Sequence, residues 1–348
     1  MKRGNIALTL FLISLLCITQ PAQATLKKDW KELTLAAQIN ASVQTALYFD
    51  PDNSADQQSR SNFDASLRLN AEWLNPQGWL LGARLEFDSG GHTAESLQRD
   101  NAYLYYADHH GRIEIGKQEG PADRLSYHAP ALGLGQIRGD FARYAGSPAL
   151  LSPFDSSDAA KIMFLSAPSH GLRYGLSYAP HYHKKATSSD PRDRTLQNSA
   201  VEMSIRYKRP LKNYVWGISS SYVNAESDPI TERANINSWS IGTQLRRQQI
   251  IMGAAYVQRG DSNLAKPNHD QWEINAGISL QKKTWGMAIS SSNTQSNRSR
   301  QRLIGFGGYA RLSKQLTLRA DLVIIEERNS QADKDSGYVF VSELEVRI

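Results

Sequence analysis

Residues 63–73 read FDASLRLNAEW, and apolar and polar side chains alternate through the whole stretch. One parity runs Phe, Ala, Leu, Leu, Ala, Trp, and the other runs Asp, Ser, Arg, Asn, Glu. A period of two places these two sets on opposite faces of a β-strand. Residues 37–48 and 79–87 alternate in the same way. These stretches therefore predict strands with one apolar face and one polar face.

The alternation continues to the end of the chain and predicts sixteen strands in all. The predicted strands lie near 37–48, 63–73, 79–87, 101–107, 111–118, 160–166, 172–179, 199–208, 213–223, 236–245, 249–258, 271–281, 284–292, 302–312, 316–327 and 338–348.

Short and long connectors alternate between these strands. The short ones, such as 74–78 and 282–283, are the size of a turn, whereas the long ones, such as 88–99 and 180–198, are several times longer. Strands joined by hairpins at one rim and by long loops at the other form an up-and-down antiparallel sheet. Greek-key connections have no reason to keep this order.

Charged residues on the polar parity decide between a soluble and a membrane barrel. Sixteen strands make a barrel too wide for side chains to fill, so an apolar interior would be empty. Charged side chains fit a water-filled lumen, and a closed barrel leaves no unpaired backbone groups in hydrocarbon. We therefore predict an all-β fold, an antiparallel transmembrane β-barrel of about sixteen strands with short periplasmic turns and long outer loops. The expected lumen charges are Arg68, Arg84, Glu86, Arg112, Glu202, Arg206, Glu273, Arg319, Asp321, Glu343, Glu345 and Arg347.

Aromatic residues gather at the predicted strand ends, as the two interfacial girdles of a membrane barrel require. Those beside short turns are Trp73, Trp79, Tyr207, Tyr214 and Trp285, and those near long loops are Tyr103, Tyr222, Trp239, Trp272 and Tyr338. The girdle hypothesis places these side chains on the outer face.

The beginning of the chain has the pattern of a cleaved secretory signal. A Lys-Arg pair precedes an apolar run over 6–18, and Ala-Gln-Ala follows at 22–24. The run is too short to span a bilayer as a helix, which argues against an uncleaved anchor. We expect residues 1–24 to be removed, which leaves 25–348 as a single barrel domain.

Charge and composition exclude several other classes of protein. The formal net charge is +6, and loss of Lys2 and Arg3 with the signal would lower it to +4, which is too mild to indicate nucleic-acid binding. Cys17 is the only cysteine and would also be removed, so the exported chain would carry no disulfide. No G-x-S-x-G or H-E-x-x-H motif occurs. We expect no nucleic-acid partner, no metal, no cofactor and no enzymatic activity.

The third long connector, residues 120–158, differs from the others in composition. It reads GPADRLSYHAPALGLGQIRGDFARYAGSPALLSPFDSSD, with several Gly and Pro and no regular period. Loops of this length are usually functional or disordered. Its apolar residues, Leu125 and Phe141 among them, must pack against something. We expect this segment to fold, without secondary structure, into the mouth of the barrel and to narrow it.

Two stretches resemble the general porins of Gram-negative bacteria. Residues 116–123, GKQEGPAD, are similar to the Gly-basic-Gln step at which the fifth strand of those porins ends and their long third loop begins. Residues 161–180, KIMFLSAPSHGLRYGLSYAP, are similar to their sixth and seventh strands. The resemblance implies a sixteen-stranded homotrimeric diffusion channel in the outer membrane, in contact with the lipid bilayer and lipopolysaccharide. It also implies basic residues on the barrel wall that face acidic residues of an inserted third loop.

Two features depart from that family. The chain ends in Ile348, whereas outer-membrane barrels commonly end in Phe. Residues 141–146, FARYAG, stand where the enterobacterial third loop commonly has a Pro-Glu-Phe-Gly tip. The residues of the narrowest point, and with them the ion selectivity, therefore do not carry over from the family.

Five charged residues are the candidates for the narrowest region of the pore. Arg68, Arg84 and Arg112 lie on the polar parity of neighbouring early strands and would form a basic ladder on one wall. Asp123 and Asp140 lie on the inserted loop and would face them. Opposed charges across a narrow aqueous gap produce a transverse field, which orients a dipolar solute and disfavours an apolar one.

The pattern leaves alternatives for both the site and the function. Each arginine could instead lie away from the narrowest zone and pair with a nearby Glu or Asp, and Asp140 could pair locally with Arg138 or Arg143. The leading function is a passive outer-membrane channel for small hydrophilic solutes and ions. A substrate-selective channel would need an aromatic slide or a dense ladder of one charge sign in the lumen. A barrel enzyme would need a Ser/His or Asp/His set that the sequence does not show.

Overall fold

The computed structural model describes most of the chain from Thr25 onward. The described residues are 25–30, 32–49, 58–89, 98–144, 149, 153, 155–157, 159–184, 195–227, 234–262, 270–297, 299–329 and 334–347. The predicted signal segment, 1–24, and Ile348 lie outside them.

Seventeen strands occupy most of these residues. Their bounds are β1 Thr25–Trp30, β2 Leu33–Phe49, β3 Gln58–Leu74, β4 Leu80–Asp88, β5 Gln98–Ala107, β6 Gly111–Lys117, β7 Ala160–Ser166, β8 Leu172–Lys184, β9 Thr195–Leu211, β10 Tyr214–Ser227, β11 Ile236–Arg247, β12 Ile250–Gly260, β13 Gln271–Gln281, β14 Trp285–Gln295, β15 Ser299–Arg311, β16 Leu316–Asn329 and β17 Lys334–Arg347.

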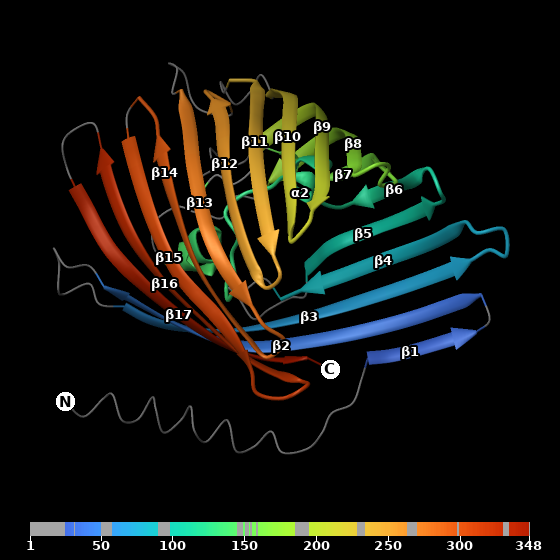
Figure 1. Ribbon diagram of the computed structural model, residues 1–348, viewed down its shortest axis with the longest axis horizontal. Coiled ribbons are helices and arrows are strands. Elements are labelled where there is room, and N and C mark those ends of the chain that lie inside the picture. Colours follow the sequence, from blue (N-terminus) through green and yellow to red (C-terminus); the bar gives the residue numbers. More distant parts are fainter. Residues whose placement is uncertain are drawn as a thin grey trace.

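Strands β2 to β17 form a closed ring (Figure 1). Each pairs antiparallel with its successor, and β17 closes the ring on β2, from Tyr338↔Phe49 to Arg347↔Asn40. Backbone groups that would be free at a sheet edge are thereby paired. The predicted sixteen-stranded antiparallel barrel is confirmed, and each of its predicted strands is present.

Strand β1 is an addition that the sequence analysis did not predict. It pairs with the beginning of β2, from Thr25↔Gln38 to Trp30↔Leu33. It therefore lies next to the part of β2 that precedes Asn40, which β17 does not pair with. The segment reads TLKKDW, and because its middle is a run of charges it shows no alternation.

Successive side chains alternate between the two faces of the barrel, as the period of two predicts. In β8, Leu172, Tyr174 and Leu176 are exposed, whereas Gly175 and Ser177 are buried on the inner face. Large apolar residues thus form the outward surface, which is the inverse of a soluble barrel.

Tyr103 is the exception among the predicted girdle aromatics. It is only 8% exposed and lies on the parity opposite to the outward-facing Leu104 and Tyr106. The reason is visible in residues 102–106, AYLYY, where both parities carry apolar or aromatic side chains. The assignment of Tyr103 to the outer face was therefore wrong, and its ring belongs to the lumen.

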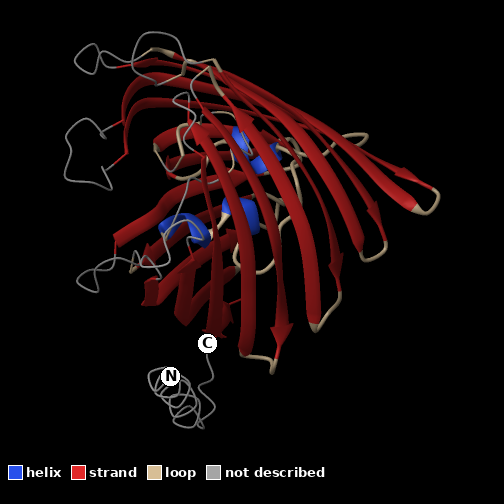
Figure 2. Ribbon diagram, turned by 90° about the vertical axis from the view of Figure 1, so that its left-hand side faces the viewer, coloured by secondary structure: helices blue, strands red, loops and turns tan. Residues whose placement is uncertain are grey.

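The short turns gather at one end of the barrel (Figure 2). Two connectors expected to be long are short, because their strands extend beyond the predicted ends. Residues 296–298 join β14 to β15, and residues 330–333 join β16 to β17. The first is closed by a hydrogen bond of 2.8 Å from the Ser296 amide to the Ser299 carbonyl.

The third long connector folds into the lumen, as Figure 2 shows by the helices inside the curve of strands. Contrary to expectation it contains regular structure, namely α2 Pro121–Leu125 and the 3₁₀ turns η2 Gln136–Arg138 and η3 Asp140–Arg143. No helix among the described residues is long and apolar enough to cross a membrane.

Apolar residues of the loop pack on an apolar area of the inner wall. Ile137 and Phe141 are buried against Leu303 of β15, Val323 of β16 and Val339 of β17. The hydrophobic effect therefore holds the loop inside the barrel, against one side of it.

Candidate permeation site in the lumen

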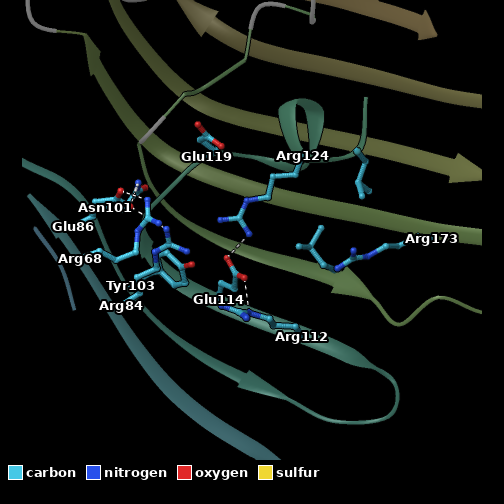
Figure 3. A pocket seen from close by; sticks show the side chains of 12 residues that line it. Arg68, Arg84, Glu86, Asn101, Tyr103, Arg112, Glu114, Glu119, Arg124 and Arg173 are labelled. Carbon is cyan, nitrogen blue, oxygen red and sulfur yellow. Dashed lines mark hydrogen bonds and ion pairs between the residues drawn. The ribbon is translucent and has the colours of Figure 1, made fainter. Parts of the chain in front are cut away.

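Strands β3, β4 and β6 place three arginines on one stretch of the inner wall. Arg68 lies opposite Glu86 in the β3–β4 register, and Arg84 lies opposite Tyr103 in the β4–β5 register. Together with Arg112 they border a cavity of about 560 Å³ between the wall and the loop (Figure 3). The residues that line it are Arg68, Arg84, Glu86, Asn101, Tyr103, Arg112, Glu114, Glu119, Arg124, Leu125, Leu165 and Arg173.

Glu86 joins the first two arginines of this wall. Arg68 forms an ion pair with one carboxylate oxygen, and Arg84 Nη2 lies 3.1 Å from the other oxygen, Oε2. The two arginine side chains are 33% and 31% exposed, so their guanidinium groups still meet the lumen. The shared carboxylate fixes both groups and offsets one of their two charges.

Glu114 of β6 likewise joins two arginines, and it also reaches the loop. Arg112 Nε lies 2.6 Å from Glu114 Oε1, and Arg124 of α2 donates from Nη1 to Oε2 at 2.9 Å. The Arg112 guanidinium carbon lies 3.5 Å from the centre of the Tyr105 ring, which is cation–π contact. The buried Glu114 thus connects the wall to the inserted loop.

Neither of the two predicted loop acids lines this cavity. Asp123 Oδ1 pairs with Arg138 Nη2 at 2.6 Å. Asp140 Oδ2 accepts a hydrogen bond from Gln44 Nε2 at 2.6 Å, and its other oxygen lies 3.6 Å from Arg143 Nε. Of the two local partners considered for Asp140, Arg143 is the one that it meets.

Glu119 is the loop carboxylate that does line the cavity. Enclosure by the surrounding protein atoms and the nearby Asp123 carboxylate raise the pKa of Glu119 above its ordinary value, although Arg138 and Arg124 oppose the shift. Glu119 is therefore neutralised at a higher pH than an isolated glutamate. Its protonation makes the cavity more positive.

Both ends of the loop are fastened by one buried carboxylate, which we call the Glu202 clamp. Glu202 of β9 accepts hydrogen bonds from the Ala122 amide at 3.3 Å and from the Ser156 amide at 2.9 Å. Lys161 Nζ lies 3.4 Å from the same carboxylate, and both side chains are fully buried. A Cβ at position 120 would collide with this carboxylate, so a larger residue than Gly120 would displace the clamp.

Further side chains of the wall fasten the middle of the loop. The Tyr127 amide donates to Ser219 of β10 at 2.7 Å, and the Ala129 amide donates to Asn275 of β13 at 2.9 Å. Asp321 of β16 accepts from the Gln136 amide at 2.6 Å. Because successive amides are bound to separate strands, the loop is a fixed component of the lumen.

Sequence reasoning missed several residues of this site. Glu119, Arg124 and Arg173 line the cavity, and the polar parity of strand 172–179 was a signal for Arg173 alone. Glu202 and Asp321 were expected as lumen charges, but the loop covers them and uses them as hydrogen-bond acceptors. No group of three potential metal ligands occurs among the described residues.

Residues 7–330 match the family model described as Gram-negative porin, so the chain belongs to the Gram-negative porin family. The anion-selective porin from Comamonas acidovorans has 12% identity and a TM-score of 0.65 over 91% of this chain and 100% of that chain. OmpF of Salmonella typhi, in complex with daunomycin, has 11% identity and a TM-score of 0.70 over 93% and 100%. OmpT of Vibrio cholerae, in its trimer form, has 10% identity and a TM-score of 0.59 over 90% and 99%. A comparison with curated proteins finds no match.

The family and the closed barrel together define the activity of the chain. It is an outer-membrane channel through which small solutes diffuse passively. At identities of 10–12% the solved structures show the fold alone, so the selectivity must be argued from the residues of this lumen.

Proposed function

We propose that the channel is narrowest, and selects by charge, where Arg68, Arg84 and Arg112 face the inserted loop, and that residues 120–158 act as its constriction loop. The balance of charge carries this proposal, because five arginines and three glutamates line the cavity. A surplus of fixed positive charge in a narrow, water-filled passage concentrates anions. The channel therefore passes small hydrophilic solutes, and anions in preference to cations. Asp123 and Asp140 act indirectly, through the ion pairs that shape the loop.

The substitution Arg84→Glu tests this selection. It changes the lining from five positive and three negative groups to four of each, so the anion preference should nearly vanish. In planar bilayers under a KCl gradient, purified wild-type protein should show stepwise conductance and a reversal potential on the anion side. The variant should show a reversal potential shifted toward the cation side.

Lys283→Glu makes the same change of charge in an exposed turn and serves as the control. It should leave the reversal potential close to that of the wild type, because salt screens an exposed charge beyond about 8–10 Å. An Arg84→Glu channel with wild-type selectivity would exclude Arg84 from the selecting zone. Wild-type protein without stepwise events would contradict the diffusion channel itself.

We further infer that residues 1–24 direct export and are removed, and that the remaining barrel assembles as a homotrimer in the lipid bilayer. The basic pair, apolar run and Ala-Gln-Ala motif support the first inference. The family resemblance and the trimer form of the similar Vibrio cholerae OmpT support the second. Native mass spectrometry of the extracted protein should give three copies of a chain that begins at Thr25, and a monomer mass would contradict the trimer.

An outward-facing arginine patch supports contact with lipopolysaccharide. Arg300 and Arg302 of β15 and Arg328 of β16 border a cavity of about 160 Å³ together with Glu326 and Glu327. The arginines share the parity of the outward-facing Phe306 and Ile324, so they lie on the same outer face, nearer the outer loops. Guanidinium groups at that height suit the phosphates of a lipid head group. Arg300→Glu together with Arg328→Glu should reduce the lipopolysaccharide retained by the purified channel, and unchanged retention would exclude this patch.

A further inference from the structure

Arg173 and Arg206 lie directly opposite each other on strands β8 and β9. Both belong to the inner parity, because Leu172, Tyr174 and Ile205 next to them face outward. The Cβ atoms of directly opposed residues lie about 5 Å apart, and like charges in this relation are destabilising. No ion pair joins either arginine to a carboxylate among the described residues. The hydrogen bond described for the Arg173 guanidinium runs from Nε to the Ser166 carbonyl at 3.2 Å.

Two further guanidinium groups lie beside Arg173. Figure 3 shows Arg112 and Arg124 meeting at Glu114, with Arg173 beside them at the same cavity. Both of them contact Glu114, and Arg173 with its strand partner Arg206 adds two positive charges to the same wall. Glu119 also lines the cavity, but it is not paired with any of the four through a described ion pair. The wall thus keeps a positive surplus that its own residues leave unmatched.

Aromatic rings hold some of these side chains in place before any ligand arrives. The Arg112 guanidinium stacks at 3.5 Å on Tyr105, and that of Arg206 lies 5.6 Å from the centre of the Tyr127 ring. Because a side chain that is already fixed loses little entropy on binding, such a cluster is prepared for a ligand.

We propose that Arg112, Arg124, Arg173 and Arg206 form a binding site for a doubly charged oxyanion, such as sulfate, hydrogen phosphate or a phosphate ester. This inference rests on the proposed anion preference and deepens it, since the preferred solute is held for a time and not merely concentrated. Planar guanidinium forks match the paired oxygens of such anions. Chloride lacks this geometry and carries half the charge, so it passes without being held.

Sulfate block of the chloride current tests the site. Sodium sulfate, added to wild-type channels that conduct KCl in planar bilayers, should reduce the current in a saturable way. In the double variant Arg173→Gln/Arg206→Gln the half-blocking concentration should rise at least about tenfold, because two charge-assisted contacts are lost. Stepwise events in KCl should still occur, with a weaker anion preference because Arg173 belongs to the charge surplus of the cavity. Arg173→Lys/Arg206→Lys keeps the two charges but loses the planar guanidinium forks. Its half-blocking sulfate concentration should lie between those of the wild type and the Gln double variant.

Arg300→Gln, on the outer face, is the matched control and should leave the sulfate block unchanged. A shift in gel mobility on heating shows that each variant is a folded barrel. Wild-type channels that conduct KCl without sulfate block would overturn the binding site and leave the diffusion channel standing. Equal half-blocking sulfate concentrations in the wild type and the Gln double variant would also overturn the binding site. A wild type without anion preference would contradict the proposed function instead.

Discussion

The buried Lys161–Glu202 pair shows what one residue contributes to this channel. Neither side chain is exposed, and the carboxylate also holds both ends of the inserted loop. A buried ion pair adds little net stability, but removal of one partner leaves an uncompensated charge and costs about 3–5 kcal/mol. The intact pair therefore fixes the position of the loop, although it adds little net stability to the barrel.

Lys161→Met should loosen the loop without unfolding the protein. Glu202 would then keep its amide donors but lose its counter-charge, at a cost of about 3 kcal/mol, while the closed backbone ladder stays intact. Single-channel recordings should show greater current noise and a broader spread of conductance, and trypsin should cut the loop sooner. Lys283→Met in an exposed turn is the control. If the Lys161 variant showed the current noise and the spread of conductance of the wild type, the clamp would not fix the loop.

At the scale of elements, the strands and the loop differ in how much the sequence reveals. The period of two predicted each of the sixteen barrel strands, because one face of each strand meets lipid and the other meets the lumen. Arg68, Arg84 and Arg112 could be placed on one wall for the same reason. Glu119, and not Asp123, lines the cavity with these arginines because residues 121–125 form the short helix α2. No period in the sequence predicts this helix.

The side of the barrel on which the loop packs did leave a signal in the sequence. Residues 322–325, LVII, and 338–341, YVFV, are apolar on both parities, and strands covered on both faces read as continuous apolar runs. Val323 and Val339 in these runs are the inner-face residues on which the loop packs. The hydrogen bonds of the loop to Asn275 and Ser219 could not be read in this way, because they join residues that only the folded barrel brings together.

The close approach of the loop to β11 gives a test at the same scale. A side chain at Gly242 would collide with the Tyr127 carbonyl, so Gly242→Val should push the loop away from the wall and into the open region of the lumen. The conductance step should become smaller, and the largest polyethylene glycol that enters the pore should become shorter. Ile241→Val, at the adjacent outward-facing position, should change neither. An undiminished conductance in the glycine variant would show that the loop does not narrow the pore here.

At the scale of the whole molecule, the barrel is inverted relative to a soluble protein. Large apolar side chains cover its outer face, whereas the lumen carries ion pairs and serines. The outward surface in an outer-membrane barrel meets acyl chains, so a charge placed there is costly in proportion to its depth.

Ile289→Arg tests this inversion. Ile289 is 41% exposed on the outward face of β14, midway along the strand, and arginine there should lower the free energy of unfolding by about 2–4 kcal/mol. Urea titration of the protein folded into lipid vesicles measures the change. Ser66→Arg, on the inner face, should cost about 1 kcal/mol, as for the loss of one hydrogen bond. Equal costs at the two positions would argue against lipid around the barrel.

The helical segments of the loop pack on only part of the barrel wall. They contact β8 to β10 and β14 to β17, whereas the open cavity borders β3 to β8. The route through the barrel is consequently off-centre, and every permeating ion passes along the same few strands. Selectivity can therefore be re-engineered along that bank, whereas substitutions of the polar residues behind the loop, such as Asn275 and Asp321, would act through the position of the loop that they hold.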